Sequence, residues 1–344
     1  MAKKIFKTLE EQINILEGKG LVVRNRTFAE EVLFRENYFF LNGYRHPFMK
    51  SKDVKIYIGG TTFEELYSLF TFDRKLRNIL FKNILIIENN IKSIISYQLS
   101  KKYGYHERDY LNPSNFNNTF DYKKRINDLI GKMKRQIKTN ATQHSATKHY
   151  ALNYGYIPLW VLVKVLSFGI VVELFSVLKK EDQYDIIDNY GLDLETFSCY
   201  LSILSNYRNL CAHEDIVYEN RSQRHINDCS FHRMLNIPMM DNEYIYGKND
   251  LFSLMIIFRS MLKDEEVSSL VCEIENIINE LDYNLKTIPV NKILDRMGFP
   301  ENWNEIKNIR KEIFWWGIIK KLGFFLVSFY MFGVLLLELF FLFV

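Results

Sequence analysis

The segment Arg208-Asn209-Leu210-Cys211-Ala212-His213 combines a permanent cation, an amide and an imidazole over one and a half helical turns. Asn209 and His213 are four residues apart and would share one face of a helix. The Arg208 side chain is long enough to reach back along that surface. Arginine can hold a phosphate with two parallel hydrogen bonds, and histidine can accept or donate a proton near neutral pH. This set therefore suits cleavage of a phosphodiester, with Arg208, Asn209 and His213 as catalytic candidates.

The spacing by itself is weak, because an Arg and a His five residues apart often occur on a solvated or capping helix face. Tyr207 and Glu214 flank the segment and are further candidates for substrate contact. A metal is not needed for this chemistry, and the sequence contains no acidic cluster that would hold one. We therefore predict neither a cofactor nor a bound metal ion.

The elements that must position these residues are predicted to be helices. The 344-residue chain is 48% hydrophobic and 25% charged, and its 15 Gly and 6 Pro leave few chain breakers. Apolar residues recur at helical spacing, and capping boxes begin helices at Thr8 and at Thr62. We expect helices near residues 8–18, 27–40, 62–103, 123–138, 157–180, 193–213, 250–262 and 265–285, with a flexible link at residues 139–149.

Several segments resemble the Abi-like family of the HEPN superfamily. Arg208 to His213 fits the R-x4-H motif, with Asn after the Arg, that marks HEPN ribonucleases. Further similar blocks occur in the family's order and cover most of residues 5–303: TLEEQINILEGKGLVV, NYFFLNGYRHPF, GTTFEELYSLFTFDRKLRNIL, IPLWVLVKVLSFGIVVELFSVL, YRNLCAHEDIVYENR and MGFPENW. The hydrophobic end of the chain lies outside this pattern.

The resemblance implies an all-α fold, a HEPN-type helical bundle in residues 61–303 with a smaller helical subdomain in residues 1–60. It also implies a homodimer or higher oligomer in which Arg208 and His213 of two copies line one composite pocket. The implied function is a metal-independent endoribonuclease of phage defence, of the abortive-infection or toxin–antitoxin kind, which cuts RNA by 2′-OH attack. Related proteins are regulated by a structured RNA, which makes such an RNA a candidate partner.

Contacts with RNA are expected from basic residues outside the motif. The best basic patch contains Lys132, Lys134, Arg135 and Lys138, with Lys148, His144 and His149 nearby, and a solvated helix face explains it equally well. Arg221, which follows the motif, is another candidate phosphate contact. The net charge of only +4 does not by itself indicate a nucleic-acid-binding protein.

The last part of the chain, residues 304–344, is a separate hydrophobic tail. Residues 322–344 are almost entirely apolar, and basic residues precede them, so they are a candidate membrane segment. We expect the body of the protein to be cytoplasmic, with free cysteines and without a signal peptide, and tethered to the inner face of the membrane if the tail inserts.

Two other functions fit the same sequence. In the first, the protein is a non-catalytic RNA-binding module regulated by a structured RNA, in which Arg208 and the basic patch hold RNA and His213 only caps a helix. In the second, it is an effector whose hydrophobic tail disrupts a membrane. Among the other polar residues, Cys229, His225 and His232 match no standard zinc spacing. Asp73 and Arg74 are expected to be helix-surface or helix-packing charges.

Overall fold

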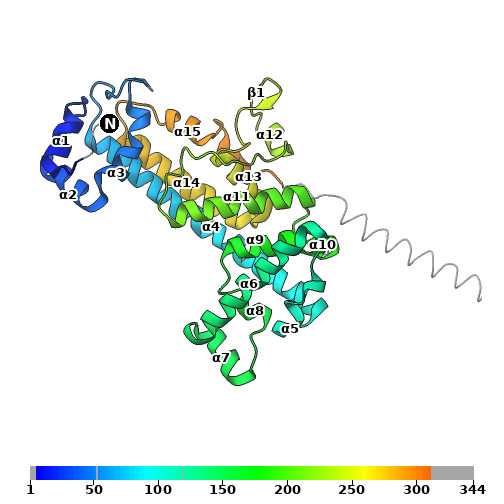
Figure 1. Ribbon diagram of the computed structural model, residues 1–344. Helices are drawn as coiled ribbons and strands as arrows, with labels where there is room; N and C mark the ends of the chain where they lie inside the picture. Colours follow the sequence, from blue (N-terminus) through cyan, green and yellow to red (C-terminus); the bar gives the residue numbers. More distant parts are fainter. Residues whose placement is uncertain (1–4, 52, 118, 311–344) are drawn as a thin grey trace, which may run out of the picture. The chain divides into compact units, whose positions relative to one another are not determined.

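The computed structural model describes residues 5–51, 53–117 and 119–310 of the chain. These residues are mainly helical (Figure 1), which confirms the prediction of an all-α fold. Regular strands within them are limited to one antiparallel pair, β1 (Met239–Met240) and β2 (Glu243–Tyr244).

The described residues form two compact units. The first unit joins the chain up to Ile87 to residues 203–309, and the second unit contains residues 88–202. Both divisions fall inside long helices, α4 (Phe63–Tyr103) and α11 (Leu194–Ala212). The predicted boundaries, by contrast, lay after residues 60 and 303. The N-terminal helices therefore group with the C-terminal ones.

Side chains next to the first turn cap the N-terminal helices of the first unit. Thr8 Oγ1 accepts a hydrogen bond from Glu11 N, and the Glu11 carboxylate accepts one from Thr8 N, which completes the predicted capping box of α1 (Leu9–Glu17). The predicted helix over residues 27–40 is wrong as a single element. It is broken at Asn37, whose φ of 66° is left-handed and whose side chain caps the next helix. The resulting elements are α2 (Arg26–Glu36), α3 (Tyr38–Asn42) and the 3₁₀ helix η1 (Gly43–Phe48).

Helix α4 is the longest element and begins at the predicted capping box of Thr62 and Glu65. Its first part lies antiparallel to α14 (Asp264–Asn284), as the ion pairs Lys75–Glu280 and Lys82–Glu273 show. The remaining elements of the first unit are α12 (Ser230–Met234), α13 (Leu251–Met261), α15 (Asn291–Met297) and the 3₁₀ helix η3 (Trp303–Lys307).

Helix α13 lies in the core of the first unit, since all of its residues are buried. Its N-cap is Asp250, the residue near which the sequence predicts the start of this helix, and the Asp250 carboxylate accepts hydrogen bonds from Ser253 N and Gly247 N. Gly298 ends α15 with a φ of 75°, and a Cβ atom at this position would lie 2.2 Å from Asp250 Cγ. A side chain at this position would therefore require a left-handed φ and a shift of Asp250.

Two predictions for the second unit are wrong. The predicted helix over residues 157–180 is wrong as a single element, because Ser167 caps a new helix after a break. The predicted flexible link at residues 139–149 is also wrong, because it is helical on both sides of His144. The elements are α5 (Glu107–Tyr110), η2 (Pro113–Asn115), α6 (Phe120–Gln143), α7 (Ser145–Tyr154), α8 (Leu159–Leu162), α9 (Phe168–Val177) and α10 (Lys180–Ile187).

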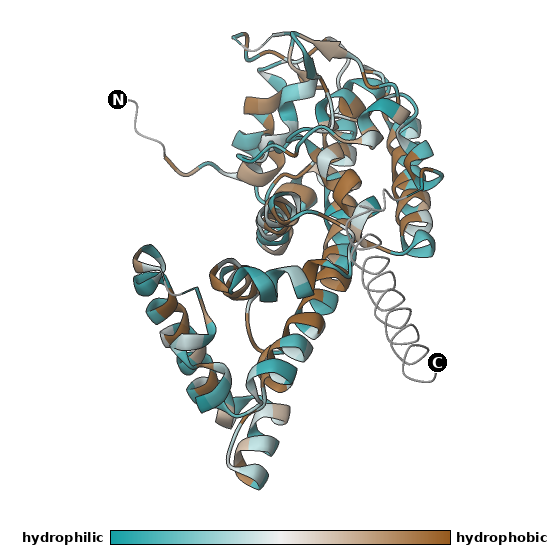
Figure 2. Cartoon of the chain, turned by 90° about the vertical axis from the view of Figure 1, so that its right-hand side faces the viewer, coloured by the Kyte–Doolittle hydropathy of each residue, from teal (hydrophilic) through white to brown (hydrophobic). Residues whose placement is uncertain are grey.

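Hydrophobic residues lie on one side of the amphipathic helices, as the colouring in Figure 2 shows. In α6 the buried face consists of Ile126, Leu129, Ile130 and Met133, which recur at helical spacing. Within residues 5–310 no helix is long and apolar enough to cross a membrane. The candidate membrane segment at residues 322–344 lies outside the described residues.

Replacement of Gly298 by alanine is expected to destabilise the protein by about 1–3 kcal/mol, because it adds a Cβ at a left-handed φ against Asp250. Gly169 is the matched control. It lies near the start of α9, with open space around its Cβ position, so Gly169→Ala should leave stability unchanged or raise it by up to about 1 kcal/mol. Urea unfolding of both variants measures the difference. Equal stabilities of the two variants would show that the close approach of Gly298 to Asp250 does not require glycine.

Candidate functional site

The helix that carries Arg208 and Asn209 ends immediately before His213. Asp193 caps its first turn by accepting hydrogen bonds from Thr196 N and Thr196 Oγ1. At the other end, His213 N donates to Asn209 O, and Asp215 N donates back to Leu210 O across a left-handed residue. This is the Schellman ending of a helix. The left-handed residue is Glu214, with a φ of 58°, where glycine is usual, so this turn is strained at a non-glycine position.

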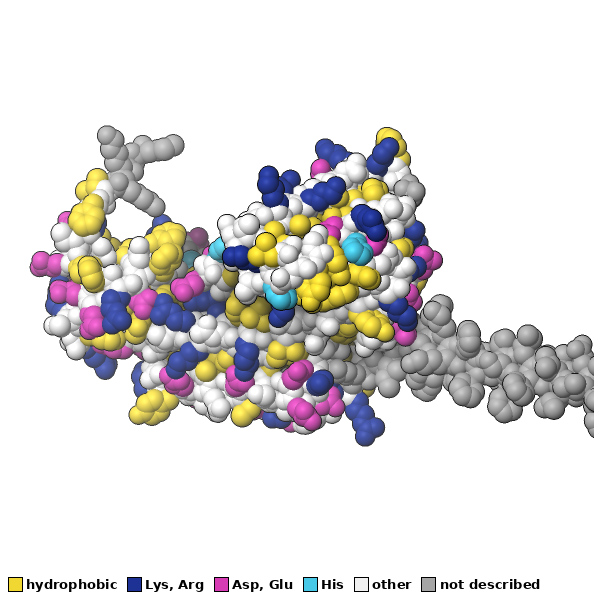
Figure 3. All heavy atoms as spheres, turned by 90° about the horizontal axis from the view of Figure 1, so that it is seen from below, with side chains coloured by type: hydrophobic (Ala, Val, Ile, Leu, Met, Phe, Trp, Pro, Cys, Tyr) yellow, Lys and Arg dark blue, Asp and Glu magenta, His cyan; other side chains and the backbone are white. Residues whose placement is uncertain are grey.

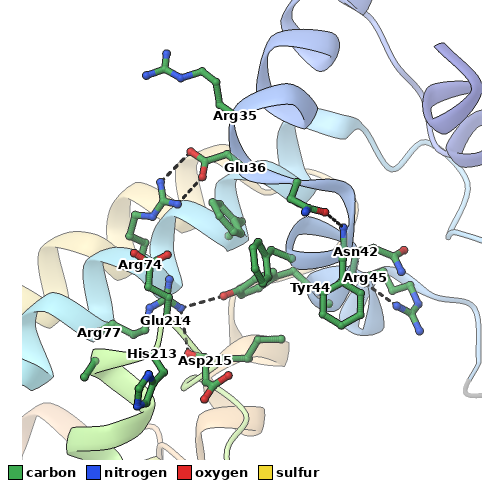
Figure 4. Close-up of a pocket in the computed structure, with 17 residues that line it drawn as sticks. Arg35, Glu36, Asn42, Tyr44, Arg45, Arg74, Arg77, His213, Glu214 and Asp215 are labelled. Carbon is green, nitrogen blue, oxygen red and sulfur yellow. Dashed lines mark hydrogen bonds and ion pairs between the residues drawn. The ribbon is translucent and has the colours of Figure 1, made fainter. Parts of the chain in front are cut away.

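His213 is exposed and lines a pocket of about 770 Å³ (Figure 4). The other walls come from distant parts of the sequence, namely α2 to η1 and the first part of α4. The pocket is lined by Arg35, Glu36, Asn37, Phe39, Phe40, Asn42, Gly43, Tyr44, Arg45, Phe70, Arg74, Arg77, Ala212, His213, Glu214, Asp215 and Ile216. Its volume lies in the usual range of small-ligand sites.

The structure does not bring Arg208 and Asn209 into this pocket. Asn209 is exposed on α11. Arg208 is half-buried, and its guanidinium lies 5.6 Å from the centre of the Phe81 ring. Of the three predicted catalytic residues, His213 alone lines the pocket, together with the flanking Glu214. Within one chain, therefore, Arg208, the predicted phosphate ligand, and His213, the predicted acid or base, do not line the same cavity.

A buried carboxylate fixes the backbone that follows His213. Asp73 on α4 is fully buried, and its two oxygens accept hydrogen bonds from Val217 N at 3.3 Å and Tyr218 N at 2.9 Å. Arg77 lies one turn further along α4 and pairs with Asp73 at 2.5 Å. The same guanidinium nitrogen donates to Asp215 O at 3.2 Å. Both residues are helix-packing charges, as predicted for Asp73, and together they hold residues 215–218 against α4.

Tyr44 of η1 completes this network. Its hydroxyl donates to Asp73 Oδ2 at 2.8 Å and accepts from Arg77 at 3.0 Å. Burial raises the pKa of Asp73 to about 6, although the charge of Arg77 and the hydrogen bonds oppose this effect. The guanidinium of Arg77 and the three hydrogen-bond donors around Asp73 all favour its ionised form.

The pocket contains four arginines and several aromatic residues that their spacing in the sequence did not indicate as site residues. Arg74 forms two hydrogen bonds with the Glu36 carboxylate, at 2.9 and 2.5 Å, and lies 4.7 Å from the Phe70 ring centre (Figure 4). Phe39 and Phe40 remain 76% and 58% exposed, although they are large and apolar. The unusual clustering of aromatics in NYFFLNGYRHPF was the sequence signal that could have indicated them. Core packing explains only some of these rings.

Two neighbours of the motif are unsuited to direct chemistry in this structure. Tyr207 is fully buried, and burial raises the pKa of its hydroxyl. Burial also raises the pKa of the Cys211 thiol to about 12, so this thiol is not ionised at neutral pH. Cysteine nucleophile chemistry at the motif is therefore disfavoured.

The predicted RNA-binding residues are distributed over both units. In the second unit, Lys134, Arg135 and Lys138 are exposed or partly exposed on α6, whereas Lys132 forms an ion pair with Glu173 at 2.7 Å. In the first unit, Arg221 is exposed and donates to the carbonyl oxygens of Asn220 and Arg296. On the face shown in Figure 3, basic side chains are interspersed with acidic ones over much of the surface.

His232 has a structural role. It is buried, its Nε2 lies 3.0 Å from Gly247 O, and its Nδ1 lies 3.1 Å from Cys229 Sγ. Burial lowers the pKa of the imidazole, which favours its neutral form. Within the described part of the chain, no group of three or more His, Cys, Asp and Glu side chains is placed to hold a metal ion.

Comparisons with known proteins identify a family. The family model described as Abi-like protein matches residues 31–219, which is more than half of the chain. This range includes the pocket walls from α2 to η1, the first part of α4 and the whole motif segment. No curated protein and no solved structure matches.

Removal of the buried carboxylate is expected to be strongly destabilising. Asp73→Ala leaves Arg77 buried without its ion pair and removes the acceptor of two backbone N–H groups, so the free energy of unfolding should fall by about 3–5 kcal/mol. Lys82→Ala removes an exposed ion pair on the same helix and should cost less than about 1 kcal/mol. Urea unfolding compares the two variants. Similar losses would show that the Asp73 network does not hold the fold.

Proposed function

Because this chain belongs to the Abi-like protein family, we propose that it is an abortive-infection effector that cuts RNA with Arg208 and His213. The family supports an abortive-infection type of function. The endoribonuclease activity is our proposal, and it rests on the R-x4-H motif and on the surroundings of His213.

The position of His213 is the observation that carries the proposal. Its imidazole is exposed at the edge of a pocket that also contains arginines and two exposed phenylalanines. An imidazole that solvent and substrate can reach is able to move protons near neutral pH. The Asp73 network fixes the backbone two residues beyond His213, so the imidazole is attached to a rigid support.

The proposed reaction is a transesterification within the RNA. The His213 imidazole takes the proton of a ribose 2′-OH, and the 2′ oxygen attacks the adjacent phosphorus. The bond from phosphorus to the 5′ oxygen of the next nucleotide breaks, and that oxygen receives a proton. The products are a 2′,3′-cyclic phosphate and a free 5′-OH. Arg208 stabilises the negative charge on the phosphate, and Asn209 orients the phosphate or the imidazole.

We further propose that two copies of the chain form this site. Arg208 does not line the pocket of the His213 in its own chain, whereas the proposed site needs both residues of the R-x4-H motif at one phosphate. Both residues lie on or next to the end of α11, so a two-fold pairing of these helix ends would bring the motifs of two copies together. The site would then contain Arg208 and His213 from each copy.

RNA cleavage is expected to require both residues. His213→Ala should lower the rate of RNA cleavage by about 10²–10⁴-fold, because it removes the proton acceptor, and Arg208→Ala should lower it by about 10²–10³-fold. Gel analysis of total RNA incubated with purified protein measures the rate, and end analysis of the products detects the cyclic phosphate. A DNA strand of the same sequence lacks the 2′-OH and should remain intact.

His225→Ala is the matched control, because this imidazole is also exposed but belongs to a loop elsewhere in the first unit. It should cut RNA at the wild-type rate. If Arg208→Ala and His213→Ala also cut at that rate, the site assignment is wrong. If the wild type binds RNA but does not cut it, the protein is an RNA-binding module instead.

A site shared by two copies predicts that activity depends on concentration. On dilution below the dissociation constant of the dimer, the cleavage rate per chain should fall in proportion to the dimer fraction. Analytical ultracentrifugation over the same range gives that fraction. A rate per chain that stays constant while the protein becomes monomeric would show that one copy is sufficient.

A further inference from the structure

A second pocket of about 560 Å³ in the first unit is strongly basic. Arg45, Lys55, Lys292 and Arg296 contribute four cations, and His46 adds an imidazole. Glu219 is the single acidic residue in its lining, which also includes Met49, Ser51 and Val54. Such an excess of positive charge attracts an anion.

The hydrogen bonds within this pocket show which cations are free to hold a ligand. Arg296 pairs with Glu219 at 2.6 Å, so one positive charge is balanced. Lys292 Nζ donates to Pro47 O at 2.7 Å, which leaves two of its three hydrogens for other acceptors. Lys55, which also lines the pocket, is exposed. Burial and the neighbouring Arg296 lower the pKa of Lys292, and an anion beside it would relieve that unfavourable environment.

Arg45 connects this basic pocket to the pocket that contains His213. It lines both cavities, and its neighbours in η1, Tyr44 and His46, line one cavity each. The Arg45 guanidinium donates to Asn42 O at 2.7 Å, which fixes it at this position (Figure 4). The two pockets are therefore neighbours at η1.

We propose that the basic pocket binds backbone phosphates of the RNA strand whose scissile linkage lies at His213. This inference rests on the proposed function, because it takes RNA as the occupant of the first pocket. The strand would pass Arg45 between the two cavities. A base of the nucleotide in the first pocket would stack on Phe39 or Phe40, whose rings are exposed there.

The arrangement favours a strand over a small phosphorylated molecule. A lone phosphate needs one cluster of donors. Here one cavity has cations but no Phe, Tyr or Trp side chain, and the adjoining one has exposed aromatic rings together with arginines. Alternating phosphates and bases of a single strand match such a division. Phosphates would be held by charge, and bases by stacking, without dependence on sequence.

The test measures binding of a fluorescently labelled single-stranded RNA to the full chain carrying His213→Ala, so that cleavage does not interfere. In this background Lys55→Ala and Lys292→Gln together should weaken binding at least tenfold at low salt. The slope of log affinity against log salt should become shallower by about 0.7 for each phosphate that the variant no longer neutralises. Lys263→Ala is the control, because this exposed lysine lines neither pocket, and it should leave both quantities unchanged.

Thermal melting of each variant verifies folding, and Lys55→Ala alone covers the case in which Lys292→Gln does not fold. Unchanged affinity and salt slope for the folded variants would overturn the proposal. Adenosine monophosphate provides a second probe. If its binding is lost in the variants while RNA binding is not, the pocket serves a small phosphorylated molecule and the proposal is again overturned.

The outcomes also separate this inference from the proposed function. If the wild type cuts RNA and the lysine variants bind RNA normally, only the phosphate pocket is refuted. If the wild type does not cut RNA, but the lysine variants lose binding and salt dependence as expected, the nuclease assignment fails and the phosphate pocket is supported.

Discussion

The carboxylate of Asp73 is the interaction on which the site depends. A buried charge is tolerated only when its partners are complete, and this one has an arginine, a tyrosine hydroxyl and two backbone N–H groups. These partners come from η1, from α4 and from the segment after α11. One buried group therefore joins three parts of the sequence, and all three contribute residues to the pocket at His213, whose walls α2 and α3 complete.

This arrangement explains how a flexible type of element, a helix end followed by a loop, can hold a reactive side chain in place. His213 lies just beyond the last turn of α11, where a chain would ordinarily fray. The Schellman hydrogen bond from Asp215 N closes the turn, and the bond from Arg77 to Asp215 O secures the next peptide. The strained φ of Glu214 lies immediately before these two attachments, at the residue that precedes Asp215. Strain of this kind persists only where neighbouring contacts over-determine the backbone.

Local signals in the sequence were sufficient to predict where most helices of the first unit begin. Thr8 and Thr62 act as caps in the structure as expected, because capping depends on residues three positions apart. Asp250 caps the helix that was predicted to begin near it. The breaks at Asn37 and Ser167 were not predicted, since the hydrophobic pattern continues across them. For the site, residue spacing selected His213, but not Arg74, Phe39 or Arg45. These residues meet His213 only through tertiary contacts, which no local pattern contains.

The net charge of the chain, like its local sequence patterns, does not show how charges are grouped in the fold. A net charge of +4 over 344 residues gives little general attraction to a polyanion, because 41 acidic residues offset most of the 45 basic ones. Several arginines are paired internally, as Arg74 is with Glu36 and Arg77 with Asp73. Any recognition of phosphate must therefore come from places where cations outnumber acids locally. The basic pocket beside η1 meets this condition, because four cations and a single acidic residue line it.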